Sequence, residues 1–144
     1  MLAVLVGLAC SSGDSDGSPD SEGEEGSTRT VSVGDIDVEA TWLGSSDQLG
    51  DDLEAYPLGS FLLLEVSLDT HSGDLGSVDL VEAAKLNTGA GPLEPEAWVA
   101  SSDESHHRSG VLVFPRRYLV PPLKLNVALE DGVAELVWEE LPKV

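Results

Sequence analysis

The histidines of the chain are its best-placed candidates for chemistry, and all three lie in two short polar motifs. His71 belongs to an Asp-Thr-His-Ser-Gly-Asp motif that begins at Asp69, and His106 and His107 are adjacent in a Ser-His-His-Arg-Ser-Gly motif. Imidazole nitrogens together with a carboxylate suit a borderline cation such as zinc or Cu(II). The sequence therefore predicts a divalent transition-metal site formed from Asp69, His71, His106 and His107.

Strand geometry limits how these ligands combine. Asp69 and His71 are two residues apart, so on a strand their side chains face the same side. His106 and His107 are neighbours, so on a strand they face opposite sides and only one of them joins His71. Alternation alone does not decide which one. The site also requires the two motifs to lie at the same end of the fold.

A purely structural interpretation of the same residues stays open. Asp69 and Asp74 are suited to accept backbone N–H groups in Asx turns. The adjacent histidines are then solvated, or they pair with the nearby acids Asp103 and Glu104. In that case the two motifs shape loops and bind no metal.

Other site chemistries lack the residues that they need. A blue-copper site requires a thiolate inside the domain, and the only cysteine is Cys10, near the N-terminus. Ser72 and Ser105 stand near histidines, but neither lies in a nucleophile elbow or beside a glycine-rich oxyanion loop. We therefore predict a non-enzymatic domain without catalytic residues.

The elements that position these motifs are expected to be short β-strands. Apolar and polar residues alternate from residue 29 onward, most clearly in residues 36–42, 61–68, 111–114 and 123–129. Residues 61–68 are apolar on both sides at first and on one side later, which is typical of a central strand. The pattern predicts an all-β fold, a two-sheet immunoglobulin-like β-sandwich of about seven strands, with a closed barrel as the alternative.

Turn signals separate the predicted strands. Asp131-Gly132 between two alternating runs predicts a tight β-hairpin, and residues 87–91 predict another turn. Residues 79–86 fit either one helical turn or a strand. In a sandwich the loops of one end converge, so this fold allows the two histidine motifs to meet.

The charge of the chain restricts its partners. The formal net charge is −20, from 27 acids against 7 bases. Such a chain repels phosphate backbones, so we expect no nucleic-acid partner. The only basic cluster is formed by Arg108, Arg116 and Arg117, and we expect these arginines to balance local acids rather than bind a polyanion.

The N-terminus resembles the lipobox of bacterial lipoproteins. An apolar run ends in Gly7, Leu8 and Ala9 directly before Cys10, although that family usually has leucine where Gly7 stands. The resemblance implies cleavage before Cys10 and a diacylglyceryl group on its sulfur. The alternative is a frayed apolar N-terminus with an incidental cysteine. Nine apolar residues are too few to cross a bilayer, which needs about 20.

These features predict three parts and a location. Residues 1–9 are the remnant of a signal peptide, residues 10–28 a lipid-anchored, disordered acidic linker, and residues 29–144 the β-sandwich. We expect an exported cell-envelope lipoprotein that contacts the membrane through its lipid and binds zinc or Cu(II). The alternative function is a structural or protein-interaction module of the envelope without metal, whose protein partner the sequence does not identify.

Overall fold

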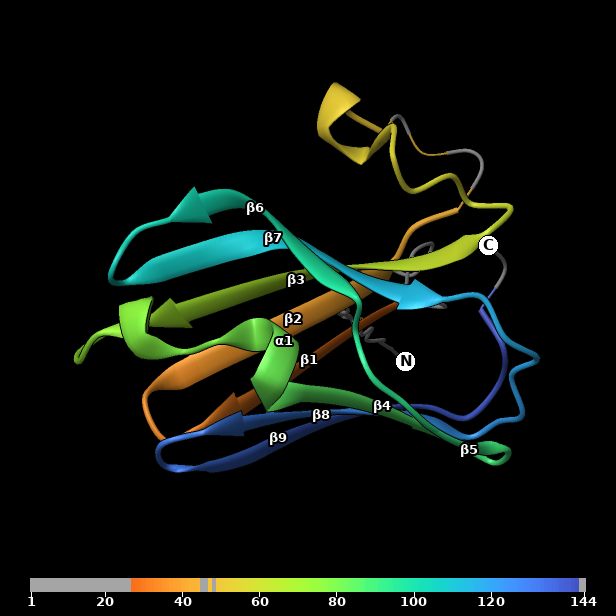
Figure 1. Ribbon diagram of the computed structural model, residues 1–144. Helices are drawn as coiled ribbons and strands as arrows, with labels where there is room; N and C mark the ends of the chain where they lie inside the picture. Colours follow the sequence, from red (N-terminus) through yellow and green to blue (C-terminus); the bar gives the residue numbers. More distant parts are fainter. Residues whose placement is uncertain (1–26, 45–46, 48, 143–144) are drawn as a thin grey trace, which may run out of the picture.

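The computed structural model describes residues 27–44, 47 and 49–142, and these form an all-β sandwich of two antiparallel sheets (Figure 1). The predicted fold class is confirmed. The lipobox with Cys10 and the predicted linker up to residue 26 lie outside the described residues. No helix among the described residues is long and apolar enough to cross a membrane.

The larger sheet contains five strands in the order β1-β2-β3-β7-β6. Its strands are β1 (Thr28–Val33), β2 (Ile36–Trp42), β3 (Phe61–Thr70), β7 (His107–Pro115) and β6 (Ala97–Asp103). β2 has the bounds that its alternation predicts, and its residues Val38 and Ala40 are fully buried. β3 lies in the middle of the sheet, as its apolar composition predicts.

The smaller sheet contains four strands in the order β5-β4-β8-β9. Its strands are β4 (Ala84–Thr88), β5 (Gly91–Leu93), β8 (Leu123–Leu129) and β9 (Gly132–Trp138). The hairpins at residues 87–91 and 130–132 form where the sequence predicts them. Gly91 and Gly132 adopt φ angles of +125° and +149°, which side chains rarely allow.

The described residues contain nine strands, against about seven expected from the sequence. One addition is β1, whose alternation is too weak to predict a strand. The other arises because Pro95, which lacks an N–H group, lies between β5 and β6 and divides residues 91–103 into two strands. For residues 79–86 the sequence allows either one helical turn or a strand. The structure contains both, because the helical turn α1 (Leu80–Ala83) leads directly into β4.

The main core lies between the two sheets. It includes two tryptophans, one from each sheet, that pack against each other. The rings of Trp42 on β2 and Trp138 on β9 pack edge to face with centroids 5.5 Å apart. The carbonyl oxygen of Ser27 accepts hydrogen bonds from the backbone N–H of Trp42 (3.1 Å) and from Nε1 of Trp138 (3.2 Å). The first described residue of the chain is therefore fixed to both sheets.

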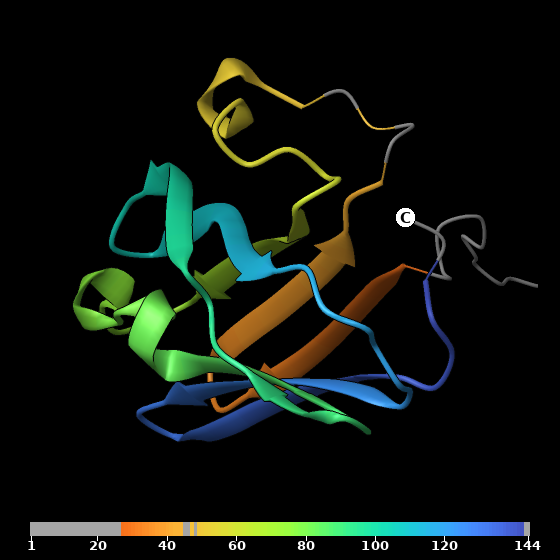
Figure 2. The same ribbon diagram turned by 45° about the vertical axis from the view of Figure 1, so that its right-hand side comes forward.

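A second, smaller core covers part of the outer face of the larger sheet. Leu63 on β3 and Val113 on β7 point away from the main core and pack with Leu53 and Tyr56. Leu53 ends the short 3-10 helix η2 (Asp51–Leu53), which projects beyond the sheet in Figure 2. Residues 49–60 thus bury the outward apolar side chains of β3, which explains why the beginning of that strand is apolar on both sides.

Gly110 on β7 is required by the close approach of β6. A Cβ atom at this position would lie 2.5 Å from the carbonyl oxygen of Val99 and 2.8 Å from Cζ2 of Trp98. We expect Gly110→Ala to push the two strands apart and to lower the free energy of unfolding by about 1–3 kcal/mol. Urea denaturation followed by tryptophan fluorescence measures this loss.

The matched control is Gly59→Ala. Gly59 lies in an exposed turn, and a Cβ atom added there would have no heavy atom within 4 Å beyond its chain neighbours. We expect this change to alter the stability by less than about 0.5 kcal/mol. Equal effects of the two substitutions would contradict the close packing of β6 on β7.

Candidate functional site

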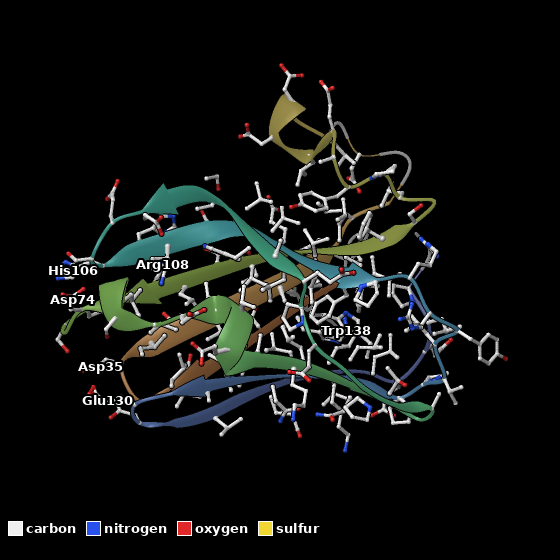
Figure 3. The ribbon with its side chains drawn as sticks, viewed as in Figure 1. Asp35, Asp74, His106, Arg108, Glu130 and Trp138 are labelled. Carbon is white, nitrogen blue, oxygen red and sulfur yellow. The ribbon has the colours of Figure 1, made fainter. Side chains whose placement is uncertain are left out.

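The turns that join the strands converge at one end of the sandwich, which we call the acidic end. It comprises the turn between β1 and β2, the loop after β3, the turn between β6 and β7, and the turn between β8 and β9 (Figure 1). Asp35, Asp74, His106 and Glu130 mark this end in Figure 3. Four segments that are far apart in the sequence therefore lie together.

The two histidine motifs meet at the acidic end. The backbone N–H of Thr70 donates to the carbonyl oxygen of His106 (3.0 Å), and the N–H of Leu75 donates to that of Ser105 (2.7 Å). These bonds join the loop after β3 to the turn before β7. The predicted metal site requires the two motifs to lie at the same end of the fold, and these backbone contacts satisfy that requirement.

The side chains of Asp69 and His107 are in direct contact. They are opposite one another in the β3–β7 pairing, and Nδ1 of His107 bonds to Oδ1 of Asp69. Both side chains lie on the outer face of the sheet, with relative exposures of 53% for Asp69 and 42% for His107. Of the two adjacent histidines, His107 is therefore the one that joins the Asp69 motif.

His71 and His106 do not complete a metal centre with this pair. β3 ends at Thr70, so the strand alternation that relates Asp69 to its neighbours does not extend to His71. His71 and His106 are both exposed. Across residues 27–44, 47 and 49–142, no three His, Cys, Asp or Glu side chains form a group that could hold a metal ion. Zinc or Cu(II) binding by the four residues stays a prediction from the sequence.

Part of the structural interpretation of the motif is realised. Oδ1 of Asp74 accepts a hydrogen bond from the backbone N–H of Gly76 (2.7 Å), which begins the 3-10 helix η3 (Leu75–Ser77). Oδ1 of Asp79 similarly accepts from the N–H of Val81 (3.1 Å) at the start of α1. These aspartates shape the loop between β3 and β4.

The same loop forms one wall of a cleft with a volume of about 540 Å³. The cleft runs between the two sheets at the acidic end. Six carboxylate side chains line it, and they come from three separate segments, the β1–β2 turn, the β3–β4 loop and the β8–β9 turn: Asp35, Asp74, Asp79, Glu82, Glu130 and Asp131. The rest of the lining combines the hydroxyl groups of Thr70, Ser72 and Ser77 with apolar side chains, which include Ile36, Leu75, Val78 and Leu129.

All charged side chains that line this cleft are acidic. Its lining contains no lysine, arginine or histidine. Asp35 accepts a hydrogen bond from Oγ of Ser72 (2.7 Å), whereas the carboxylates of Glu82, Glu130 and Asp131 have no ion-pair or hydrogen-bond partner among the described residues. A positively charged group that enters the cleft would therefore meet carboxylates that no other part of the described chain neutralises.

The side chain of Arg108 holds the η3 wall of the cleft in place. The residue is buried (8% exposed), and its Nε donates to Oδ1 of Asp103 (2.9 Å). One terminal nitrogen donates to the carbonyl oxygen of Leu75 (3.1 Å) and to that of Val78. The guanidinium also lies over the ring of Trp98, 5.9 Å from its centroid. One buried cation thus joins β7, β6 and the η3 loop.

The expectation that the three arginines balance local acids holds for one of them. Arg108 pairs with Asp103. Arg116 and Arg117 lie beyond the other end of β7 and form no ion pair with an acid of the described chain. Arginines that are close in the sequence are separated here because β7 runs the full length of the sheet between them.

The comparisons with known proteins give no guide to function. No protein-family model matches the chain, and no curated protein and no solved structure shows significant similarity to it. Function must therefore be inferred from the residues and the geometry alone.

We expect Arg108→Met to destabilise the fold by about 2–4 kcal/mol, since it removes the side-chain donor from the carbonyl groups of Leu75 and Val78 and leaves Asp103 without its ion-pair partner. Arg108→Lys should restore little of this loss, because a single ammonium cannot reach Asp103 and both carbonyl groups as a planar guanidinium does. Urea denaturation measures the change, with Arg117→Met as the exposed control. A control that loses as much stability as Arg108→Met would contradict the buried role.

Proposed function

We propose that the chain is an exported, lipid-anchored envelope protein whose β-sandwich is a non-enzymatic interaction module, and that the cleft binds a basic segment of a partner protein. The observation that carries the proposal is the lining of the cleft. Six carboxylates surround an apolar floor, and no basic side chain of the lining offsets them.

The residues that line the cleft determine which kind of ligand it can bind. Lysine or arginine side chains satisfy carboxylates such as Glu82 and Glu130 at the mouth. Ile36 and Leu129 offer apolar surface for a neighbouring aliphatic side chain. A volume of about 540 Å³ lies within the usual range of about 300–1,000 Å³ for ligand pockets. A short peptide segment that combines basic and aliphatic residues fits these conditions best.

The wall held by Arg108 supports this proposal. Because the guanidinium fixes the carbonyl groups of Leu75 and Val78, the η3 side of the cleft is preformed. A preformed site loses less conformational entropy when it binds than a loop that must first be ordered. The ligand therefore meets carboxylates that already stand in place.

Two features of the sequence support the envelope location. The lipobox-like residues 7–10 provide a single acylation site at Cys10. Residues 11–26 are composed of small and acidic residues with one proline, which are suited to hold a domain away from the anchor. An interaction module at the end of such a tether can reach partners in the surrounding compartment.

Binding of a labelled lysine–leucine peptide, followed by fluorescence anisotropy with the full chain, tests the cleft. We expect Glu82→Gln and Glu130→Gln each to weaken binding by about two- to fivefold, since exposed ion pairs contribute about 0.2–1 kcal/mol. The matched control is Glu135→Gln, which removes the same charge from an exposed position on β9 that does not line the cleft.

An equal loss with Glu135→Gln would show that the peptide responds only to the net charge and would contradict the cleft as the site. A glutamate–leucine peptide of the same length should not bind. Binding of both peptides with similar affinity would likewise contradict the charge argument.

The anchor has its own test, which is mass spectrometry of the chain recovered from bacterial membranes. We expect a mature form that begins at Cys10 and carries the mass of a diacylglyceryl group on its sulfur. Cys10→Ser should leave the precursor uncleaved and remove the protein from the membrane fraction. A membrane-bound chain that keeps Met1 and a free thiol would contradict the lipoprotein assignment.

A further inference from the structure

The end of the sandwich opposite the acidic end carries an exposed basic and aromatic loop. Residues 116–122 connect β7 to β8 at the right of Figure 1. Arg116, Arg117 and Tyr118 are consecutive and exposed, and Tyr118, with 85% relative exposure, is the most exposed large hydrophobic residue of the described chain. We call residues 116–118 the basic tip.

The basic tip is held in place although its side chains are exposed. The N–H of Arg116 donates to the carbonyl oxygen of Ser60 (3.1 Å), and its Nε donates to that of Leu58 (2.8 Å). At the other side of the loop, the N–H of Gly89 donates to the carbonyl oxygen of Val120 (2.6 Å). The fold therefore presents an exposed tyrosine on a fixed base, for which the packing of the domain gives no reason.

The strand register places the start of the domain at the same end. β1 begins at Thr28 opposite Thr41, at the end of β2, and β7 ends at Pro115 opposite Phe61, at the start of β3. Because the neighbouring strands are antiparallel, Thr28 and Pro115 lie at the same end of the sheet. Residues 11–26, which connect Ser27 to Cys10, span at most about 55 Å.

We propose that the basic tip is the surface with which the tethered domain rests on a layer of anionic lipid headgroups. This inference rests on the proposed lipid anchor at Cys10. The arginines attract anionic headgroups, and a tyrosine that is exposed beside them has the amphipathic ring typical of the membrane–water interface. Leu141, with 49% relative exposure, follows β9 at this end and adds a second exposed apolar side chain.

The distribution of charge gives the contact a direction. The six carboxylates of the cleft lie at the far end of the strands, where an anionic surface would repel them. Glu139 and Glu140 follow β9 at the near end, and the loop between β2 and β3 adds Asp51, Asp52 and Glu54 there. The attraction is therefore local to the tip and acts within a Debye length of about 8 Å. The tether allows the tip to come within this range, and when the tip is in contact the cleft faces away from the membrane.

The unique thiol allows a direct test with the full chain. Cys10 is the only cysteine, so the protein can be coupled through it to a maleimide lipid in vesicles. Chymotrypsin cleavage after Tyr118, followed by mass spectrometry, reports the accessibility of the tip. We expect cleavage on vesicles that contain phosphatidylglycerol to be about tenfold slower than on phosphatidylcholine vesicles, and high salt to remove the difference.

Matched variants separate the tip from the overall charge. Arg117→Gln should restore most of the cleavage on phosphatidylglycerol, whereas Lys85→Gln, which removes one charge from an exposed position on β4, should leave the protection unchanged. Equal cleavage on both kinds of vesicle would overturn the proposal. Protection by dissolved heparin on phosphatidylcholine, without protection on phosphatidylglycerol, would assign the tip to a soluble polyanion and would also overturn it.

Because the vesicle experiment attaches the lipid chemically, its result does not depend on whether the protein carries a lipid on Cys10 in the cell. If mass spectrometry shows no lipid on Cys10 but the coupled domain is protected on anionic vesicles, the proposed lipoprotein fails while the membrane-facing tip stands. If the lipid is present but no protection occurs, the tip fails and the anchor stands.

Discussion

The acidic end depends on the buried guanidinium of Arg108 more than on any other single interaction. Arg108 is the one charged side chain that is buried within the described residues, and a buried cation is stable only when its donors are satisfied. Asp103 and the carbonyl groups of Leu75 and Val78 satisfy them. Since these acceptors belong to different segments, the requirement to pair one charge fixes the relative position of β6, β7 and η3.

This constraint also explains why acidic side chains can gather at one end. Like charges repel, but the loops that carry them are held by backbone contacts, such as that between Leu75 and Ser105, and by the apolar floor of the cleft. Two of the acids, Asp74 and Asp79, add to this framework because their carboxylates accept backbone N–H groups at the starts of η3 and α1. At the opposite end, Arg116 and Arg117 form a local basic surface beside acids such as Glu139 and Glu140. The two ends can consequently meet different partners, a basic segment at one and an anionic layer at the other.

Much of the fold follows from local alternation in the sequence. The runs at residues 36–42 and 123–129 coincide with β2 and β8, because period-2 burial is visible without knowledge of the neighbouring strands. Asp131-Gly132 places its hairpin because the positive φ of Gly132 is a local requirement. The edge strand β1 is harder to predict, since its residues are only partly buried and alternate weakly. The outer core leaves no periodic signal because its partners, residues 49–60, follow no period.

The site is less predictable than the fold because its residues meet across strands. The contact of Asp69 with His107 depends on the β3–β7 register, which alternation within either strand does not contain. Alternation places His71 on the same face as Asp69, but that argument holds only while the strand continues, and β3 ends at Thr70. The cleft draws its carboxylates from three segments, so no spacing in the sequence marks it. What the sequence does show is acids in its turns, and the antiparallel pairing brings those at residues 35, 74–82 and 130–131 together at one cleft.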